Sequence, residues 1–468
     1  MKNSDFINSI LNEFNNDKIA FEIFDGENIH TKKYKDLLFD ILKKANFFIN
    51  NKQTQKHIAL IGKNSYNWIT LFFAIIASGN VVIPINPDLP EENIKELLRK
   101  ADINLCCIDK ETGLELTSIN NKYYISEIYS KGLMNLNDVN TYEDNDTVMM
   151  MATSGTTGRS KIVEISSLNL LEQSKNSEII GEELFVDKSM LMYPCYHISG
   201  ITHLLTYLYG NKTLCLGRGI KYLIPDMLAL NPTTVWFVPL LLDSVSKMLR
   251  LSNKDVKEIF GENIKAICVG GAKANTNSCL EFIKRGIKVA PQYGITEISG
   301  MSFMSAINEE TISSTGKLSN KYNAKIEDGE LLLSGNCVAK GYYKDKEETN
   351  KVFINGWFHT GDIASVDENG YYYITGRKKN TIILSNGENV NPEEIEDQLY
   401  KSLDIEECLV YGDEKGILVD IYTKNIDVAK ESVEKYNKNK PKYFQIYKIN
   451  FVENPLEKTG TGKIKRKR

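Results

Sequence analysis

The sequence predicts an α/β protein: a large N-terminal domain of helix-covered, largely parallel sheets with a small β-barrel-like part, then a small mobile α+β C-terminal domain. Three observations lead to this fold class. The chain has 468 residues, too many for one ordinary hydrophobic core. As far as residue 290, short apolar runs alternate with helical patterns, which is typical of parallel sheets covered by helices. After about residue 320, short strands follow turn signals.

The first strand–helix–strand unit has apolar strands at 57–62 and 81–86 on either side of a helical pattern at 66–78. The stretch from Trp68 to Ile85 is as long as a membrane span. However, Gly79-Asn80 divides it into a helix-like half and a β-branched half. We therefore expect a buried helix, a turn and a strand, and no stable membrane insertion.

Later segments complete the predicted architecture. A second strand–helix–strand unit has its elements at 265–270, 276–285 and 287–290. The turn signals Asp328-Gly329 and Asn369-Gly370 each precede a short strand, and together they predict a small antiparallel barrel or sheet. Those strands lie at 330–334 and 371–375. Beyond a border near 376–380, a helix and two strands predict a separate domain, with elements at 392–402, 408–411 and 417–422.

Composition excludes several classes of protein. The formal net charge is −4, so nothing indicates a nucleic-acid partner, although one basic cluster ends the chain at 463–468. Eight cysteines are scattered without a CxxC pair, which favours reduced thiols over disulfides or a zinc site. The N-terminus has no long apolar run and does not resemble a signal peptide. We expect a cytoplasmic protein.

The strongest local motif is the stretch TSGTTGRSK at 153–161, which follows the apolar run 148–152. Its glycines allow the backbone to wrap around an anion, its hydroxyls can donate hydrogen bonds, and its lysine supplies a positive charge. A Walker loop needs four residues between its glycines and Ser or Thr after the Lys, so this is not a P-loop kinase or GTPase. Taken alone, a flexible polar loop is the alternative.

Further motifs follow in order along the chain. Gly270-Gly271-Ala272 ends a predicted strand, and Tyr293-Gly294-Ile295-Thr296-Glu297 follows the strand at 287–290. These residues fall at the carboxyl edge of the sheet, where open α/β sheets bind ligands. The remaining motifs are WFHTGD at 357–362, GRKK at 376–379, GENVNPEEIE at 387–396 and TGTGK at 459–463.

In this order and spacing, the motifs resemble the acyl-adenylate-forming superfamily, which includes acyl-CoA synthetases, adenylation domains of peptide synthetases and luciferases. The resemblance covers nearly the whole chain, and the stretch from Gly356 to Glu396 looks most like bacterial fatty-acyl-CoA ligases. It implies that ATP and Mg²⁺ are used to convert a carboxylic acid to its acyl-adenylate. The acyl group would then pass to the thiol of CoA or, alternatively, to the phosphopantetheine of an acyl carrier protein.

The resemblance implies a role for each matching residue. Glu297 would hold Mg²⁺, Thr296 would contact the α-phosphate, and Lys463 would stabilise the transition state. Asp362 and Arg377 would bind the ribose. The ATP phosphates would contact Thr153, Ser154, Gly155, Thr156, Thr157, Gly158 and Lys161. Adenine would lie against Gly271, Ala272, Gln292, Tyr293 and Gly294, with Tyr293 stacking on it.

The acyl side of the site is less well defined. His197 matches a position beside the acyl pocket in acyl and aryl ligases, and a structural histidine is the alternative. The segment 193–200 lacks the Asp that amino-acid-activating relatives use to pair the substrate ammonium, so an amino acid is disfavoured. Mostly apolar or small residues are expected to line the pocket, which favours a fatty or other apolar acyl chain. They are Tyr196, Phe237, Val269, Ile298, Ser299, Gly300 and Met301.

The resemblance also implies how the two domains work together. An N-terminal domain at 1–376 would be joined by a hinge at 377–379, with its pivot at Lys379, to a mobile domain at 380–468. In the thiol-transfer state, a loop containing Asn386, Gly387 and Glu388 would face the active site. Two positions depart from the family's phosphate loop, because Ser160 replaces a Pro and Ile162 replaces a Gly. A homologue that binds nucleotide without catalysis is disfavoured, since the key charged residues are all present.

Overall fold

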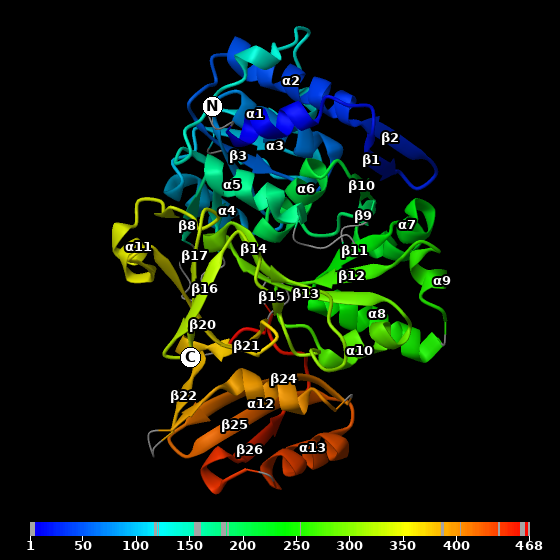
Figure 1. The fold of residues 1–468 in the computed structure, drawn as a ribbon, viewed down its shortest axis with the longest axis vertical. Helices are drawn as coiled ribbons and strands as arrows, with labels where there is room; N and C mark the ends of the chain where they lie inside the picture. The colour runs from blue at the N-terminus through cyan, green and yellow to red at the C-terminus, as the bar shows by residue number, and fades with distance from the viewer. Residues whose placement is uncertain are drawn as a thin grey trace.

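The computed structural model describes residues 5–116, 119, 121–153, 161–178, 184, 187–252, 254–384, 388–402, 404–438, 440–458 and 464–466. It shows a large N-terminal part built on three sheets and a smaller C-terminal part below it in the view of Figure 1. This is the predicted fold class. No helix in the described ranges is long and apolar enough to cross a membrane.

The first sheet contains the predicted strands at 57–62 and 81–86, which form β3 and β4. Its central strands are parallel, whereas β8 and β18 at one edge run antiparallel to their neighbours. The order is β18 (Gly341–Tyr342), β8 (Ile162–Ser166), β7 (Thr147–Ala152), β4 (Val81–Ile85), β3 (His57–Ile61), β5 (Leu105–Ile108) and β6 (Lys122–Tyr124).

The second sheet is parallel in its middle and antiparallel at both edges. The order is β14 (Gly300–Met304), β13 (Lys288–Ile295), β12 (Ala266–Val269), β11 (Thr234–Phe237), β9 (Lys188–Met190), β10 (Thr213–Leu216), β1 (Ile19–Phe24) and β2 (Ile29–Lys33). Strand β13 is longer than the predicted 287–290, so Tyr293 lies within the strand rather than after it.

A single apolar core joins these two sheets. It contains residues of both sheets together with those of α1 (Phe6–Glu13), α2 (Tyr34–Asn50), α3 (Tyr66–Ala77), α5 (Ser167–Ser174) and α6 (Ile198–Tyr209). Helix α3 forms the first half of the apolar run of membrane-span length and β4 forms the second half, and residues 68–77 of the helix are buried. Ser65 caps its start, and Gly79, with φ of 82°, turns the chain into β4. The predicted helix–turn–strand is therefore confirmed.

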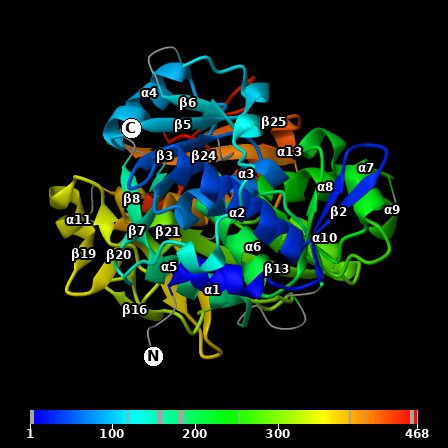
Figure 2. The same ribbon diagram turned by 90° about the horizontal axis from the view of Figure 1, so that it is seen from above.

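The remaining N-terminal helices lie at the periphery. Helices α7, α8, α9 and α10 gather on one side of the molecule, and α11 lies on the opposite side (Figure 2). Their bounds are α4 (Glu91–Lys100), α7 (Leu223–Leu230), α8 (Pro239–Ser252), α9 (Lys257–Phe260), α10 (Thr276–Lys284) and α11 (Lys346–Val352).

The third sheet is antiparallel, as the turn signals predicted. Its order is β15 (Gly316–Lys317), β21 (Tyr371–Arg377), β20 (Trp357–Val366), β17 (Glu330–Ser334) and β16 (Asn323–Glu327), and β19 (Phe353–Ile354) also pairs with β20. Asp328 and Gly329 both have positive φ and connect β16 to β17 in a tight turn. This sheet packs around a small core of its own.

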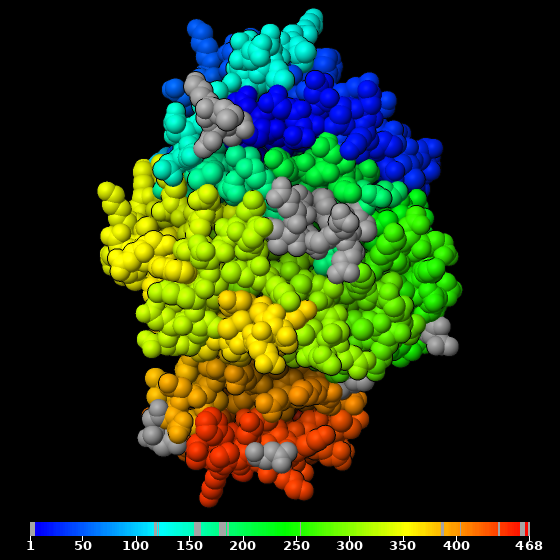
Figure 3. Space-filling view, in the orientation of Figure 1, coloured from blue at the N-terminus to red at the C-terminus, as the bar shows by residue number. Residues whose placement is uncertain are grey.

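The C-terminal part has a separate core and forms its own lobe in Figure 3. Its elements are β22 (Ile382–Ile383), β23 (Asn389–Val390), α12 (Pro392–Leu399), β24 (Ile405–Asp413), β25 (Gly416–Thr423), α13 (Ile426–Lys438) and β26 (Ile446–Phe451). Helix α12 ends before the predicted 402, and β24 extends beyond the predicted 408–411 on both sides. The lobe contacts the N-terminal part through the Lys273–Asp397 ion pair and through Asn277, which donates to the Tyr400 carbonyl at 3.1 Å.

Candidate active site

The candidate site is centred on the hairpin of β13 and β14. Its turn is tight, because a Cβ on Gly294 would lie 1.9 Å from the carbonyl oxygen of Gly300, so only glycine fits there. Ser299, with φ of 57°, turns the chain back into β14. The hairpin places residues 292–301, which include nine of the expected site residues, along one ridge.

Tyr293 projects from one face of this hairpin toward the third sheet. Its hydroxyl donates to Oδ2 of Asp362 at 2.5 Å, and Arg377 Nε lies 2.6 Å from Oδ1 of the same carboxylate. Burial, together with the charge of Asp362, raises the pKa of Tyr293 well above its ordinary value, so the hydroxyl stays protonated. Asp362 and Arg377 are cross-strand partners on β20 and β21. The expected ribose ligands and the expected adenine-stacking ring are therefore in one hydrogen-bonded group.

Glu297 and Lys161 come together through a residue that the sequence did not indicate. Tyr342 on β18 donates its hydroxyl to Glu297 Oε1 at 2.9 Å, and Lys161 Nζ lies 4.5 Å from the centroid of the Tyr342 ring. The same ammonium is 2.6 Å from Oε2 of Glu348 on α11. The ion pairs with Lys161 and then Lys351 lower the pKa of Glu348 to about 2, so it is charged at neutral pH.

The expected phosphate loop is only partly within the described residues. Thr153 and Lys161 stand at its two ends, and the Thr153 N–H donates to the Lys161 carbonyl at 2.9 Å. This bond closes the base of the loop. Ser154, Gly155, Thr156, Thr157 and Gly158 lie outside the described residues, as do Asn386 and Gly387 of the expected thiol-transfer loop and Lys463.

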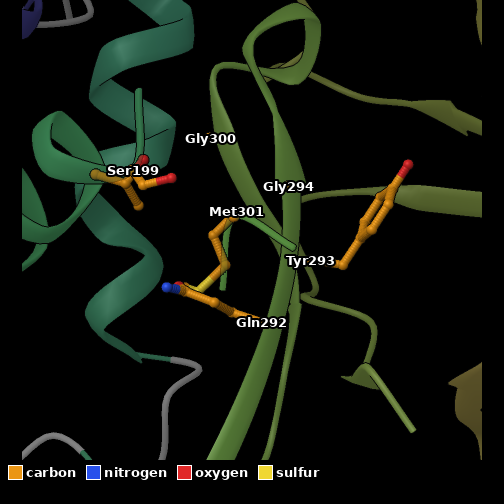
Figure 4. Close-up of a pocket in the computed structure, with 8 residues that line it drawn as sticks. Ser199, Gln292, Tyr293, Gly294, Gly300 and Met301 are labelled. Atoms are coloured by element: carbon orange, nitrogen blue, oxygen red, sulfur yellow. The ribbon is translucent and has the colours of Figure 1, made fainter. Parts of the chain in front are cut away.

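On the other face of the hairpin, a hollow separates β13 and β14 from the start of α6 (Figure 4). Gln292 and Met301 point toward α6, whereas Tyr293 points the opposite way. Gln292 donates to the Tyr193 hydroxyl at 3.2 Å, so its amide lies on this side and not beside Asp362. The lining residues are Ser199, Thr202, Gly271, Gln292, Tyr293, Gly294, Gly300 and Met301.

The lining differs from the expected acyl pocket. Phe237 and Val269 are buried in the core beneath the second sheet, and Ile298 is buried in the core of the third sheet. These three residues lie outside the hollow because the strands of Phe237 and Val269, and the helical turn of Ile298, direct their side chains into packed layers. Gly300 and Met301 do line it, while Ser199, Thr202 and Gln292 add polar groups that the sequence did not identify as acyl contacts.

The remaining expected residues come from several elements of the two lobes. His197 occupies the N-cap position of α6, and its ring centroid is 5.0 Å from that of Tyr196. Burial lowers the pKa of His197, so the imidazole is neutral near pH 7. Thr296 begins the short helical turn that follows β13, and Ala272 follows Gly271 at the end of β12. Glu388 accepts a backbone hydrogen bond from Leu384 at 2.9 Å.

The described residues contain neither an activated thiolate nor a metal site built from protein ligands alone. All eight cysteines are buried and unpaired. Burial raises the pKa of all eight thiols, so none resembles an activated thiolate. Within the described ranges, no three His, Cys, Asp or Glu side chains are grouped as metal ligands. A magnesium ion here would need phosphate oxygens as further ligands.

Several known proteins resemble this chain over most of its length. It is 24% identical to a long-chain-fatty-acid–CoA ligase, FadD15, of Mycobacterium bovis, with 89% of this chain and 86% of the relative covered. It is 29% identical to the 2-succinylbenzoate–CoA ligase of Oceanobacillus iheyensis, over 76% and 75% of the two chains.

Solved structures share its fold. The O-succinylbenzoate coenzyme A synthetase MenE of Bacillus subtilis, solved in complex with AMP, superposes with a TM-score of 0.83 at 22% identity, covering 98% of this chain and 97% of that one. MatB of Rhodopseudomonas palustris, solved with ATP bound, gives a TM-score of 0.86 at 20% identity, with the same coverage.

Family models match both parts of the chain. Residues 379–468 match the C-terminal domain of AMP-binding enzymes. Residues 11–343, well over half of the chain, match the model described as AMP-binding enzyme. The predicted superfamily is thereby confirmed, and the chain belongs to the AMP-binding enzyme family.

Proposed function

We propose that the protein is an AMP-forming acid–thiol ligase. A carboxylate oxygen of the substrate attacks the α-phosphorus of ATP, and the bond to the bridging oxygen breaks to release pyrophosphate. The thiol of CoA then attacks the acyl carbon of the acyl-adenylate, and AMP leaves. The observation that carries this proposal is that Asp362 on β20 is held by Arg377 on β21 and by Tyr293, and Tyr293 lies on the hairpin that also carries Glu297.

The first step joins two anions, so the site must supply positive charge and hydrogen-bond donors. Lys161 supplies a cation against the ring of Tyr342, whose hydroxyl binds Glu297, and Arg377 supplies another on the ribose side. Magnesium would neutralise phosphate charge, and Glu297 fits as its ligand. Its Oε1 accepts from Tyr342, and its Oε2 has no hydrogen-bond partner among the described residues. We assign Thr296 to the α-phosphate and Lys463 to the transition state by their positions in the family motifs.

The site residues are assigned on the same basis. The ends of the phosphate loop, Thr153 and Lys161, are joined by a hydrogen bond, which favours a loop that closes around an anion. Gly271, Ala272 and Tyr293 would flank adenine, and His197 would lie next to the reacting carboxylate. Gln292 turns toward the hollow, so we assign its side chain to the acyl group rather than to adenine.

The acceptor is proposed to be CoA. The relatives in the comparison are named as CoA ligases of a long-chain fatty acid and of 2-succinylbenzoate, which favours CoA and leaves both fatty and aryl acids as candidates. Loading onto a carrier-protein phosphopantetheine is the second candidate, since both acceptors present the same thiol. Measuring the rate of acyl transfer to free CoA and to a phosphopantetheinylated carrier protein would separate them.

The proposal is tested by Glu297→Gln. The amide keeps the shape of the side chain but loses the charge that offsets the cation, so magnesium-dependent ATP–pyrophosphate exchange should fall to background. Glu327→Gln is the matched control, because Glu327 is exposed at the β16–β17 turn and pairs with Lys325 away from the site. Exchange at the unsubstituted rate in Glu297→Gln would refute the assignment. Absence of exchange with every fatty, aryl and amino acid in a panel would refute the function itself.

A further inference from the structure

The hollow beside α6 is lined by polar groups, and this bears on the acid that the enzyme accepts. Its polar side chains are Ser199, Thr202 and Gln292, and Met301 is its only apolar side chain apart from the ring of Tyr293, which points away. None of the eight lining residues within the described part of the chain is charged. A pocket built for a plain hydrocarbon would present mainly apolar side chains.

Thr202 is the most informative of these residues. It is 1% exposed, and its Oγ1 has no hydrogen-bond partner among the described residues. An unsatisfied buried hydroxyl costs about 1–3 kcal/mol, so native proteins rarely keep one without a reason. Because Thr202 lines the hollow one helical turn from Ser199, a ligand in the hollow can reach both hydroxyls.

Two further unpartnered polar groups belong to Gln173, which packs against Gly300, and to Ser299, which precedes Gly300 in the chain. Gln173 Nε2 and Ser299 Oγ are buried, and neither has a hydrogen-bond partner within the described ranges. A Cβ built on Gly300 would lie 2.1 Å from Thr202 Oγ1 and 3.3 Å from Cδ of Gln173, so both side chains pack against this glycine. Tyr322 donates to Gln173 Oε1 at 2.9 Å, which leaves the amide nitrogen as the free donor.

We propose that the acyl group carries an uncharged hydrogen-bonding function, such as a hydroxyl, keto or amide oxygen, which pairs with Thr202 at the end of this hollow. The inference rests on the proposed ligase function and narrows its substrate class. It replaces the expectation of a plain fatty acid. Since no lining side chain is a cation, a second carboxylate in this position would be buried without a partner, which is unfavourable.

The test compares acids of equal length that differ only in oxygenation. Pyrophosphate release by the full chain is measured with alkanoic acids, with their hydroxy and oxo derivatives at successive carbons, and with dicarboxylic acids. A site built to bind a substrate oxygen can reject the analogue that lacks it by about 10⁴-fold. We expect at least one oxygenated acid to exceed its alkyl counterpart in kcat/KM by about 100-fold or more, which lies within the limit that such a site allows.

The variant Thr202→Val should reduce this ratio about tenfold, since it removes one hydrogen bond at nearly constant volume. Thr206→Val is the matched control: Thr206 lies one turn further along α6, is also buried and unpartnered among the described residues, and does not line the hollow. It should leave the ratio unchanged. Thermal unfolding of both variants checks that each is folded.

Three outcomes would overturn the inference. A preference for plain alkanoic acids would do so, as would a preference for dicarboxylic acids. An equal change of the ratio in Thr202→Val and Thr206→Val would show that Thr202 acts only through packing. Each of these results requires turnover of some acid, so each is distinct from failure of the ligase proposal, in which no acid supports pyrophosphate release.

Discussion

Lys161 illustrates what single residues contribute to this site. The sequence motif places a lysine at the end of a phosphate loop, and the structure shows this ammonium paired with Glu348 and lying against the ring of Tyr342. The pair joins residues 187 positions apart. Neither partner carries a sequence signal, because an acid at the start of a helix is ordinarily explained by the helix dipole. Only the packing of α11 against β18 and the loop base reveals it.

The Lys161–Glu348 pair predicts an effect on ATP binding. If Lys161 binds a nucleotide phosphate, as we propose, that phosphate must replace Glu348 as its partner, and breaking the pair opposes binding. Glu348 is about one-third exposed, so the pair is worth less than about 1 kcal/mol. Glu348→Gln should therefore lower the KM for ATP by about two- to fivefold, consistent with a pair of that strength. Steady-state pyrophosphate release at varied ATP concentration measures it.

Glu347→Gln provides the control for this prediction. Glu347 precedes Glu348 on α11 and pairs with Lys351 but not with Lys161. Its substitution makes the same change in net charge and should leave the KM for ATP unchanged. If Glu348→Gln instead raises the KM, Glu348 positions Lys161 for the phosphates and does not compete with them.

At the scale of elements, the sequence patterns predicted well which segments form helices and which form strands. They predicted poorly the direction in which the side chains of those elements point. The apolar runs at 57–62, 81–86 and 265–270 each form a strand, because burial on both faces requires continuous apolar sequence. Strand β13 extends past Ala290 through polar and glycine residues, which pattern alone does not include. Its pleat then sends Gln292 toward the hollow and Tyr293 toward Asp362. The division of the site into acyl and ribose faces follows from that register.

Helix α12 carries a partly buried acidic pair that gives the C-terminal lobe a dependence on pH. Arg466 Nη2 lies 2.6 Å from Glu396 and 3.3 Å from Glu393, so two carboxylates share one guanidinium. Burial raises the pKa of Glu396 to about 8, and the opposing effect of Arg466 does not cancel it. The folded state thus binds a proton more tightly than the unfolded chain, whose Glu pKa is about 4.3.

The pKa of Glu396 is higher in the folded protein than in the unfolded chain. The stability that its protonation contributes is therefore complete below the unfolded pKa and is lost as pH rises toward 8. We expect the melting temperature of the C-terminal lobe to fall between pH 5 and pH 8. Glu396→Gln, which cannot ionise, should have a flatter profile over this range. Glu394→Gln is the control, since Glu394 lies on the same helix and makes no contact with Arg466. Parallel profiles for Glu396→Gln and the unsubstituted protein would contradict the prediction.

At the scale of the whole molecule, the two lobes are held together mainly by polar contacts. The C-terminal core draws all its residues from 382–451, and no N-terminal residue within the described ranges belongs to it. Across the boundary lie the Lys273–Asp397 pair, the hydrogen bonds of Asn277 to the Tyr400 and Lys401 carbonyls, and the Lys247–Glu406 pair at 3.9 Å. Exposed pairs of this kind contribute about 0–1 kcal/mol each, so the boundary can reorganise at small cost.

We propose that the lobes turn about Lys379, with 1–376 as one body and 380–468 as the other. Lys379 lies in the short helical turn Lys378–Asn380 directly after β21, two residues beyond Arg377. The need for such motion follows from the roles proposed above, in which adenylation uses Lys463 at the ATP site and thiol transfer needs access to the acyl carbon. One rotation about a short hinge can meet both requirements.

The two half-reactions separate these roles. Lys463→Ala should slow adenylation by about 2.7–4 kcal/mol in activation free energy, the usual effect of losing a preorganised transition-state donor. It should leave transfer from a preformed acyl-adenylate to CoA nearly intact.

Lys379→Pro fixes φ at the pivot and restricts Lys378 before it, so adenylate should form while transfer stalls. Lys379→Ala keeps the backbone free and should behave like the unsubstituted protein in both steps. Single-turnover measurements of each half-reaction on the three variants test the rotation of the lobes. A moving lobe must affect the two half-reactions unequally. Equal slowing of both steps in Lys463→Ala and in Lys379→Pro would therefore rule out domain alternation.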